Sequence, residues 1–533
     1  MSSLSQIKAT RPDIISLIKK LDFNLLRTKI GNDILLAAEE YYEKDDSEHL
    51  ANLVVDKYGS ELIYDKDIRQ DILDRLPIER AVEICFKFKI KIDNKFQSVR
   101  KLKERYSTSS DSRIREFLEI FSLPENDFLK EKVNDSRLSC ESVSSTFGEN
   151  LVSKGVLHPY QIDVKDQIAK LVENNQRRIM VQMPTGAGKT MTALELVVDF
   201  VRSHKFEGYI VWIVESAELA EQAFNSFKNL WLLRGDRPIS IFRFFNKFEN
   251  DFSFNEGVVF TTFDKCLPAK EKNSYKALCK KSKCVIVDEA HASCADTYSQ
   301  IITELTAYDA TLIGLSATPT RNDIFEIREL VGIYGNNLVT FTDGGSKINN
   351  PIKFLQEQKY LAKIDTKILD TSDEILEKNE NRLNKLLMLN SKRNKIIIEQ
   401  IKNSIEKKES TILFACTVDH VIALNAICKK EGLDVDFITG KVRQVKREEI
   451  FERFRKKDLL VILNHEILST GIDLPKVDKL IITRPIGSKV LYAQTIGRAL
   501  RGPKNGGNER NTIVNIRDNL INFSDCVNNN SFN

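Results

Sequence analysis

Residues 179–190 read Ile-Met-Val-Gln-Met-Pro-Thr-Gly-Ala-Gly-Lys-Thr, and this stretch decides the fold of the region around it. The apolar run at its start predicts a buried strand, and the residues from Thr190 onward predict a helix. The glycines between them allow backbone N–H groups to turn toward phosphate oxygens, and a helix start adds its positive dipole end. Lys189 can then reach the β- and γ-phosphates of a nucleotide, and the Thr190 hydroxyl can bind Mg²⁺. This context favours a phosphate-binding loop over an ordinary glycine-rich turn.

A second apolar run ends in adjacent carboxylates. Residues 284–291 read Cys-Val-Ile-Val-Asp-Glu-Ala-His, so a predicted strand ends at Asp288 and Glu289. Asp288 is suited to hold Mg²⁺ directly or through water, and Glu289 is suited to align an attacking water and accept its proton. We interpret His291 as a link between this site and a neighbouring motif, with a structural histidine as the alternative.

Short apolar runs alternate with helical segments over two long parts of the chain. Runs of this kind, buried on both faces, are typical of parallel sheets in α/β domains. The expected strands lie at 179–183, 209–214, 257–260, 284–287 and 311–315, and then at 411–415, 435–438, 459–463, 479–483 and 512–516. The expected divisions are a mainly α-helical region at 1–150, an α/β domain at 151–345, a linker at 346–390 and a second α/β domain at 391–533.

Residues 1–150 are poor in glycine and helical in pattern. The apolar residues from Ile78 to Phe86 recur with the spacing of one helix face, and Pro77 suits the first turn of that helix. The run at 86–92 alternates apolar residues with lysines, which favours a solvated strand face or a helix end. A basic ribbon facing a phosphate backbone is the alternative for this run.

Composition excludes some classes of protein and leaves others open. The 533 residues include 80 Lys and Arg against 76 Asp and Glu, a net charge of +4, which excludes a histone-like polycation but not a local basic groove. The nine cysteines include no CxxC pair, so free thiols in a reducing compartment are expected. The N-terminus has no apolar signal core, and no apolar run approaches the ~20 residues of a membrane helix. We therefore expect a cytoplasmic protein without a membrane partner.

Over residues 155–518 the order of these motifs resembles the superfamily 2 ATP-dependent helicases and translocases of the DEAD/DEAH class. The resemblance implies two tandem RecA-like parallel-sheet motor domains after the helical region, ATP and Mg²⁺ as cofactors, and nucleic acid held across both domains. Two departures stand out: Met183 occupies the place of the usual first glycine, and Glu215-Ser216 replaces the more usual Pro-Thr or His-Arg.

The resemblance implies a role for residues in both expected motor domains. Gln161 would read adenine, and Arg498 and Arg501, three residues apart on one helix face, would act as arginine fingers. The expected catalytic residues are Lys189, Asp288, Glu289, Gln494, Arg498 and Arg501. The expected nucleotide-binding residues are Gln161, Pro184, Thr185, Gly186, Ala187, Gly188, Lys189, Thr190, Gly471 and Asp473, with Thr190 and Asp288 as metal ligands.

Two further groups follow from the same resemblance. The residues expected to couple hydrolysis to domain movement are His291, Ser316 and Thr318. The residues expected to contact nucleic acid are Thr262, Thr439, Gly440, Ser469 and Thr470. Taken singly, the serines and threonines are typical of helix caps or turns, and it is their order that indicates these roles.

The finer resemblance concerns residues 316–321 and 351–361, which look most like the motors of type I restriction enzymes and RadD-like DNA helicases. This favours DNA over RNA, and a helicase or translocase that couples ATP hydrolysis to movement along the phosphate backbone. The alternative is an ATP-gated clamp or switch in a defence or repair complex, without processive unwinding. In either case residues 1–150 are available to dock a protein partner.

Overall fold

The computed structural model describes most of the chain. The described residues are 11–38, 47–128, 138–144, 157–203, 207–317, 324–343, 346–348, 350–375, 377, 379–465, 476–486, 492, 495–497 and 500–520. Within these ranges, no helix combines the length and the apolar character that crossing a membrane requires.

The N-terminal region is built from short helices, as expected. They are α1 Arg11–Ile18, α2 Phe23–Ile30, α3 Asn32–Ala38, α4 Ser47–Tyr58, η1 Gly59–Tyr64, α5 Lys66–Asp74, α6 Ile78–Lys87, η2 Lys95–Gln97, α7 Ser98–Arg105, α8 Asp111–Ile120 and α9 Glu125–Phe128. Pro77 is the N-cap residue of α6, where its missing N–H costs nothing. The alternating run at 86–92 is the end of α6 and the loop after it.

The first α/β domain contains an eight-stranded sheet in the order β1-β4-β5-β3-β6-β7-β2-β8. Its strands are β1 Cys140–Val143, β2 Arg178–Gln182, β3 Tyr209–Val214, β4 Ile239–Phe244, β5 Gly257–Thr262, β6 Ser282–Asp288, β7 Thr311–Ser316 and β8 Leu338–Val339. Its helices are α10 Pro159–Glu173, α11 Lys189–Arg202, α12 Ala217–Arg234, α13 Phe263–Ala269, α14 Asn273–Lys281, η3 Ala290–Cys294, α15 Asp296–Leu305 and α16 Ile324–Tyr334. Every pairing except that of β1 with β4 is parallel.

Strand β1 precedes the expected boundary at residue 150, yet it forms the edge of this sheet. Arg243 on β4 explains how the strand is held, because its buried guanidinium lies 2.5 Å from Glu141 of β1 and 2.9 Å from Glu221 of α12. Residues 140–143 therefore pack with the first sheet and not with the N-terminal helices.

The second α/β domain contains a six-stranded parallel sheet in the order β11-β16-β15-β12-β14-β13. Its elements are β11 Lys363–Ile375, α18 Glu380–Leu389, α19 Ser391–Glu406, β12 Thr411–Phe414, α20 Val418–Lys430, β13 Val435–Ile438, α21 Gln444–Arg455, β14 Val461–Asn464, β15 Lys479–Ile482, η5 Pro503–Asn505 and β16 Arg510–Leu520. Between the two sheets lie β9 Thr342–Asp343, β10 Ser346–Lys347 and α17 Pro351–Glu357. The expected linker at 346–390 thus includes an edge strand, β11, which pairs with β16.

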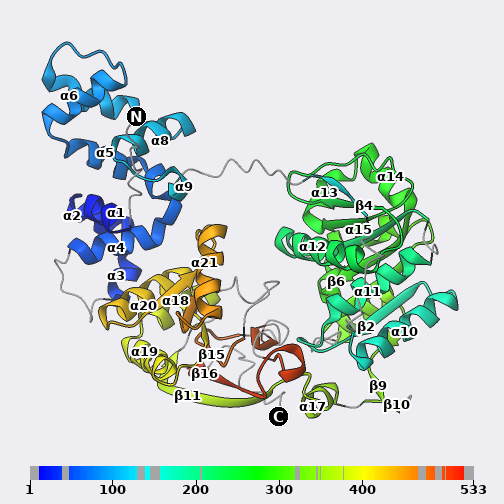
Figure 1. The fold of residues 1–533 in the computed structure, drawn as a ribbon. Helices are drawn as coiled ribbons and strands as arrows, with labels where there is room; N and C mark the ends of the chain where they lie inside the picture. The colour runs from blue at the N-terminus through cyan, green and yellow to red at the C-terminus, as the bar shows by residue number, and fades with distance from the viewer. Residues whose placement is uncertain are drawn as a thin grey trace.

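The expected fold class is confirmed: two parallel-sheet α/β domains follow a helical region (Figure 1). All ten strands expected from the sequence are present, and each observed end lies within four residues of the expected one. In Figure 1 the N-terminal helices lie beside the second α/β domain, where α3 and α4 pack against α20.

A buried ion pair connects the start of α19 to the end of β16. Arg393 and Asp518 are 0% and 1% exposed, and their side chains approach to 3.0 Å. The guanidinium also donates to the Thr483 carbonyl, and the Thr371 hydroxyl donates to Asp518 at 3.0 Å. Because both charges of the pair are buried, the pair should be far more sensitive to loss of one partner than an exposed pair is.

We therefore expect Arg393→Met to lower the free energy of unfolding of the second α/β domain by about 3–5 kcal/mol, because it leaves the Asp518 carboxylate buried without a cation. Urea unfolding followed by circular dichroism measures the change. Lys402→Met is the matched control, since it breaks the half-exposed pair with Glu431 at 2.9 Å and should cost at most about 1 kcal/mol. Equal losses in the two variants would contradict this account.

Candidate active site

Three neighbouring parallel strands bring the sequence motifs to one edge of the first sheet. Strand β7 lies between β6 and β2, and the register pairs Gln182 with Ser316 and Asp288 with Leu315. The carboxyl ends of these strands therefore lie side by side, the usual place for a ligand site in an open parallel sheet. The Met183 N–H donates to the Ser316 carbonyl at 3.1 Å, which fixes the start of the loop after β2.

The loop between β2 and α11 needs both of its glycines. Gly186 and Gly188 each have φ +81°, a left-handed conformation that other residues rarely adopt. A Cβ atom on Gly188 would also overlap the side-chain amide of Gln161. Since Gly188 is the N-cap of α11, the first N–H groups of that helix open toward this loop.

Four residues expected to act on a nucleotide meet across β2 and β6. The Thr190 hydroxyl donates to Asp288 Oδ2 at 2.9 Å. The Lys189 ammonium, only 8% exposed, lies 3.4 Å from Glu289 Oε1. The structure therefore brings together the lysine, the hydroxyl and the two carboxylates that the sequence placed about a hundred residues apart.

The carboxylates of Asp288 and Glu289 lie close together in a largely buried site. Burial and the nearby Glu289 carboxylate raise the pKa of Asp288 to about 6, although Lys189 and the Thr190 hydrogen bond act in the opposite direction. Glu289 itself has φ +54°, an unfavourable value for a residue other than glycine, and its N–H donates to Asp288 Oδ1 at 3.1 Å. Strained backbone of this kind persists where the surrounding structure holds it, often at functional sites.

The donor set fits Mg²⁺ and a chain of phosphates. The hydroxyl of Thr190 and the carboxylate of Asp288 are hard oxygen ligands, and Mg²⁺ usually keeps water and phosphate oxygens as its other ligands. Within the described ranges no three His, Cys, Asp or Glu side chains cluster as a metal site. The Thr185 hydroxyl is buried and has no hydrogen-bond partner among the described residues, which suits a phosphate acceptor.

Gln161 holds the phosphate-binding loop in place. Its Oε1 accepts from the His158 N–H at 2.8 Å, as the N3 residue of a capping box at the start of α10. Its Nε2 donates to the Ala187 carbonyl at 3.0 Å, and the Tyr160 hydroxyl donates to the same carbonyl at 3.0 Å. The Gln161 amide thus binds the loop between β2 and α11 directly. Adenine reading by Gln161 stays a prediction.

The described coupling residues lie next to the acidic pair. His291 is 6% exposed in η3, and its Nδ1 lies 3.5 Å from Glu289 Oε2. Ser316 is fully buried at the end of β7, where it meets the loop after β2. Both positions are compatible with a link between hydrolysis and movement, which stays a prediction.

The described residues expected to contact nucleic acid have local structural partners. The Thr262 hydroxyl caps α13 by accepting from the Lys265 N–H at 3.3 Å. The carbonyls of Thr439 and Gly440 accept from the Arg447 guanidinium at 3.1 and 3.4 Å. These contacts match the cap and turn reading, and their roles toward nucleic acid stay predictions.

The second α/β domain touches the phosphate-binding loop directly. A Cβ atom on Gly186 would lie 3.3 Å from Leu500 Cβ, and one on Gly497 would overlap the Thr185 side chain. His158 contributes a polar contact, because its Nε2 lies 2.7 Å from Asn505 Oδ1. The sequence reading missed this contact between His158 and Asn505, since neither residue carries a motif signal and 347 positions separate them.

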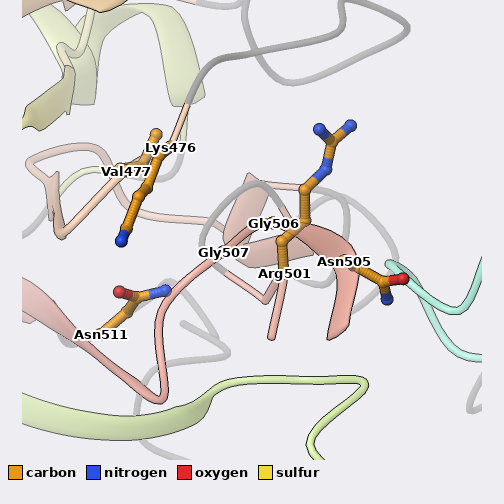
Figure 2. A pocket seen from close by; sticks show the side chains of 7 residues that line it. All are labelled: Lys476, Val477, Arg501, Asn505, Gly506, Gly507 and Asn511. Atoms are coloured by element: carbon orange, nitrogen blue, oxygen red, sulfur yellow. The ribbon is translucent and has the colours of Figure 1, made fainter. Parts of the chain in front are cut away.

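Arg501 directly follows Leu500 in the sequence, and its side chain is exposed. Its backbone pairs with Leu361, and it lines a pocket with Lys476, Asn505 and Asn511. Figure 2 shows its guanidinium pointing away from the Asn511 side chain. The structure thus brings the Arg501 segment to the loop, while its role as an arginine finger stays a prediction.

The remaining candidate residues lie outside the described residues. They are Thr318, Ser469, Thr470, Gly471, Asp473, Gln494 and Arg498.

Comparison with known families agrees with the two sheets. Residues 154–321 match the family described as type III restriction enzyme, res subunit, and residues 391–503 match the helicase conserved C-terminal domain. One solved structure to which the chain is similar in fold is the ATP-dependent type ISP restriction-modification enzyme LlaBIII, bound to DNA. It has a TM-score of 0.50 and 15% identity, and covers 69% of this chain and 28% of that chain.

Two curated proteins are similar over much of this chain. The helicase-family protein IRC3 of Saccharomyces cerevisiae is 27% identical over 368 residues, which cover 66% of this chain and 50% of that protein. The type I restriction enzyme EcoKI endonuclease subunit of Escherichia coli K12 is 25% identical over 398 residues, which cover 65% of this chain and 33% of that protein. This chain thus matches half or less of the length of either relative. The family matches, these relatives and the paired parallel sheets show that the chain belongs to the superfamily 2 helicases.

Proposed function

We propose that the chain is a nucleic-acid-dependent ATPase that works as a DNA helicase or translocase with ATP and Mg²⁺. This proposal rests on one observation: Lys189 and Thr190 contact Glu289 and Asp288, and the segment of the second α/β domain around Gly497 and Leu500 lies beside them. Similarity to a type I restriction enzyme subunit supports DNA as the nucleic acid, ahead of RNA.

Each residue of the site has a separable task. The Lys189 ammonium and the N–H groups at the start of α11 hold the β- and γ-phosphates. Thr190 and Asp288 hold Mg²⁺, which supplies positive charge where the phosphates carry negative charge. Glu289 aligns water for attack on the γ-phosphate and accepts its proton, and its distance of 3.4 Å from Lys189 keeps it at the phosphate end of the loop.

Movement would come from the contact between the two domains. The segment around Gly497 and Leu500 lies against the loop, so arginines of that segment, Arg498 and Arg501, can neutralise γ-phosphate charge when the domains are closed. Hydrolysis and release of the γ-phosphate would remove the negative charge that these arginines bind. The closed arrangement would then be less stable, so the two domains could separate and bind the nucleic acid at a new position.

The domain division that we propose follows the sequence expectation. It assigns residues 1–150 to a helical accessory domain, 151–345 and 391–533 to the RecA-like domains, and 346–390 to the connection, with β1 and β11 contributed to the sheets from outside these limits. Residues 1–150 are available for a protein partner. The described cysteines form no disulfide, which supports a reducing, cytoplasmic compartment.

The second candidate is an ATP-gated clamp on nucleic acid or a partner protein. It is favoured by the helical region, whose helices α3 and α4 pack against α20 of the second motor domain and could transmit its closure. The ATP site serves both functions equally, so only an assay of movement separates them.

Glu289→Gln should lower the ATP turnover number by about 10²–10⁴-fold while ATP binding persists, because the amide cannot accept the proton of water. Phosphate release and the binding of a fluorescent ATP analogue measure the two effects. Glu271→Gln is the control: it removes an exposed carboxylate of the same domain and should leave turnover unchanged. Full turnover in Glu289→Gln would remove that residue from the proposed role.

A motor should show nucleic-acid-stimulated ATP hydrolysis and displace a strand from a DNA duplex or a third strand from a triplex. We expect greater stimulation by DNA than by RNA when single-stranded DNA, double-stranded DNA and RNA are compared in one preparation. Displacement in neither assay, with stimulated hydrolysis intact, would select the clamp. Greater stimulation by RNA would overturn the DNA assignment.

A further inference from the structure

One corner of the N-terminal helical region carries aromatic side chains that have no place in the core. Phe86 at the end of α6 and Phe96 in η2 are each 73% exposed. The elements α6 and η2 pack together, so both rings belong to one corner of the region. Burying a phenylalanine ring is strongly favourable, so two rings left in water mark this corner as a contact surface.

The loop between the two rings separates apolar from charged side chains. Its apolar members pack against the core of the helical region: Phe88, Ile90 and Ile92. The lysines between and beside them are exposed: Lys87, Lys89, Lys91 and Lys95. The alternation in the sequence therefore results from a loop anchored on one side, and it turns the ammonium groups outward.

Most of this positive charge is uncompensated. Lys87 pairs with Glu119 at 2.8 Å. Among the residues that the structure describes, none forms an ion pair with Lys89, Lys91 or Lys95, and Asp93 is the one acidic residue of positions 86–97. We name the corner formed by residues 86–96 the Phe86–Phe96 surface.

We propose that the Phe86–Phe96 surface binds single-stranded nucleic acid, with bases stacked on the two phenylalanine rings and phosphates beside the free lysines. Surfaces that bind single strands without sequence preference combine these same elements, aromatic faces for bases and cations for the backbone. An apolar protein partner would use the rings but not the three lysines without an ion pair among the described residues, and an acidic one would use the lysines but not the exposed rings. The Lys95 ammonium lies 5.4 Å from the centroid of the Phe96 ring, so a phosphate beside Lys95 would be close to a base stacked on that ring.

The surface is fixed to the second motor domain through the rest of the helical region. Asp56 of α4, whose side chain is 1% exposed, accepts from Asn425 at 2.9 Å and from Lys429 at 3.3 Å, both on α20. Ile422 and Ala426 of the same helix join the apolar core of the N-terminal region. A strand bound at the Phe86–Phe96 surface is therefore held by a body that moves with the second motor domain.

The double variant F86L/F96L tests the stacking, because leucine keeps apolar bulk and removes the aromatic face. We expect at least about tenfold weaker binding of a fluorescein-labelled oligothymidine, measured by anisotropy on the full chain without nucleotide. F86W/F96W should restore the affinity. Phe254→Leu, at a 48% exposed ring in the first motor domain, is the control and should bind as the wild type does.

The triple variant K89Q/K91Q/K95Q tests the phosphate contacts. Three lost contacts to a single strand should flatten the slope of log affinity against log salt by about 2. K20Q/K66Q/K392Q removes three exposed lysines elsewhere and should keep the wild-type slope. Unchanged affinity in F86L/F96L, or an unchanged slope in the first triple variant, overturns the proposal. The readout needs no ATP hydrolysis, so it is independent of the motor assignment.

Discussion

The parallel register of β2, β7 and β6 is the constraint on which the rest of the site depends. It sets the end of β2 beside Ser316 and the end of β6 one strand further along, so the phosphate-binding loop and the acidic pair face each other. The hydrogen bond from Thr190 to Asp288 closes that arrangement. The neighbouring Lys189 ammonium lies 3.4 Å from Glu289 Oε1 at the same edge of the sheet.

Local signals explain what the sequence could predict. A strand buried on both faces shows a continuous apolar run, and ten such runs became strands. The loop at 183–190 was predictable because its glycines, lysine and threonine are close together in the sequence and form a recognisable motif. Strand β11 was missed because it is an edge strand whose residues are largely exposed, so its sequence reads as polar. Strand β1 is held beside β4 by the ion pair between Arg243 and Glu141, residues about a hundred positions apart, so no local pattern predicts it.

Contacts between distant segments account for what the sequence could not predict in the site. Adenine reading by Gln161 stays a prediction, and the sequence did not indicate that its amide is bound within the first domain by the N-terminal cap of α10 and a loop carbonyl. The approach of Gly497 and Leu500 to the loop depends on how two separate cores meet, which no periodicity encodes. The attachment of the helical region to α20 likewise combines a buried aspartate, Asp56, with apolar contacts of Ile422 and Ala426, and none of these residues lies in a recognisable motif.

The central claim is that Lys189 anchors a nucleotide whose hydrolysis depends on nucleic acid. The most direct measurement is the ATPase rate of Lys189→Ala with and without DNA, beside Lys276→Ala, which removes an exposed ammonium of the same domain. The account predicts loss of DNA-stimulated hydrolysis in Lys189→Ala and a wild-type rate in Lys276→Ala. Full DNA-stimulated hydrolysis in Lys189→Ala would contradict it.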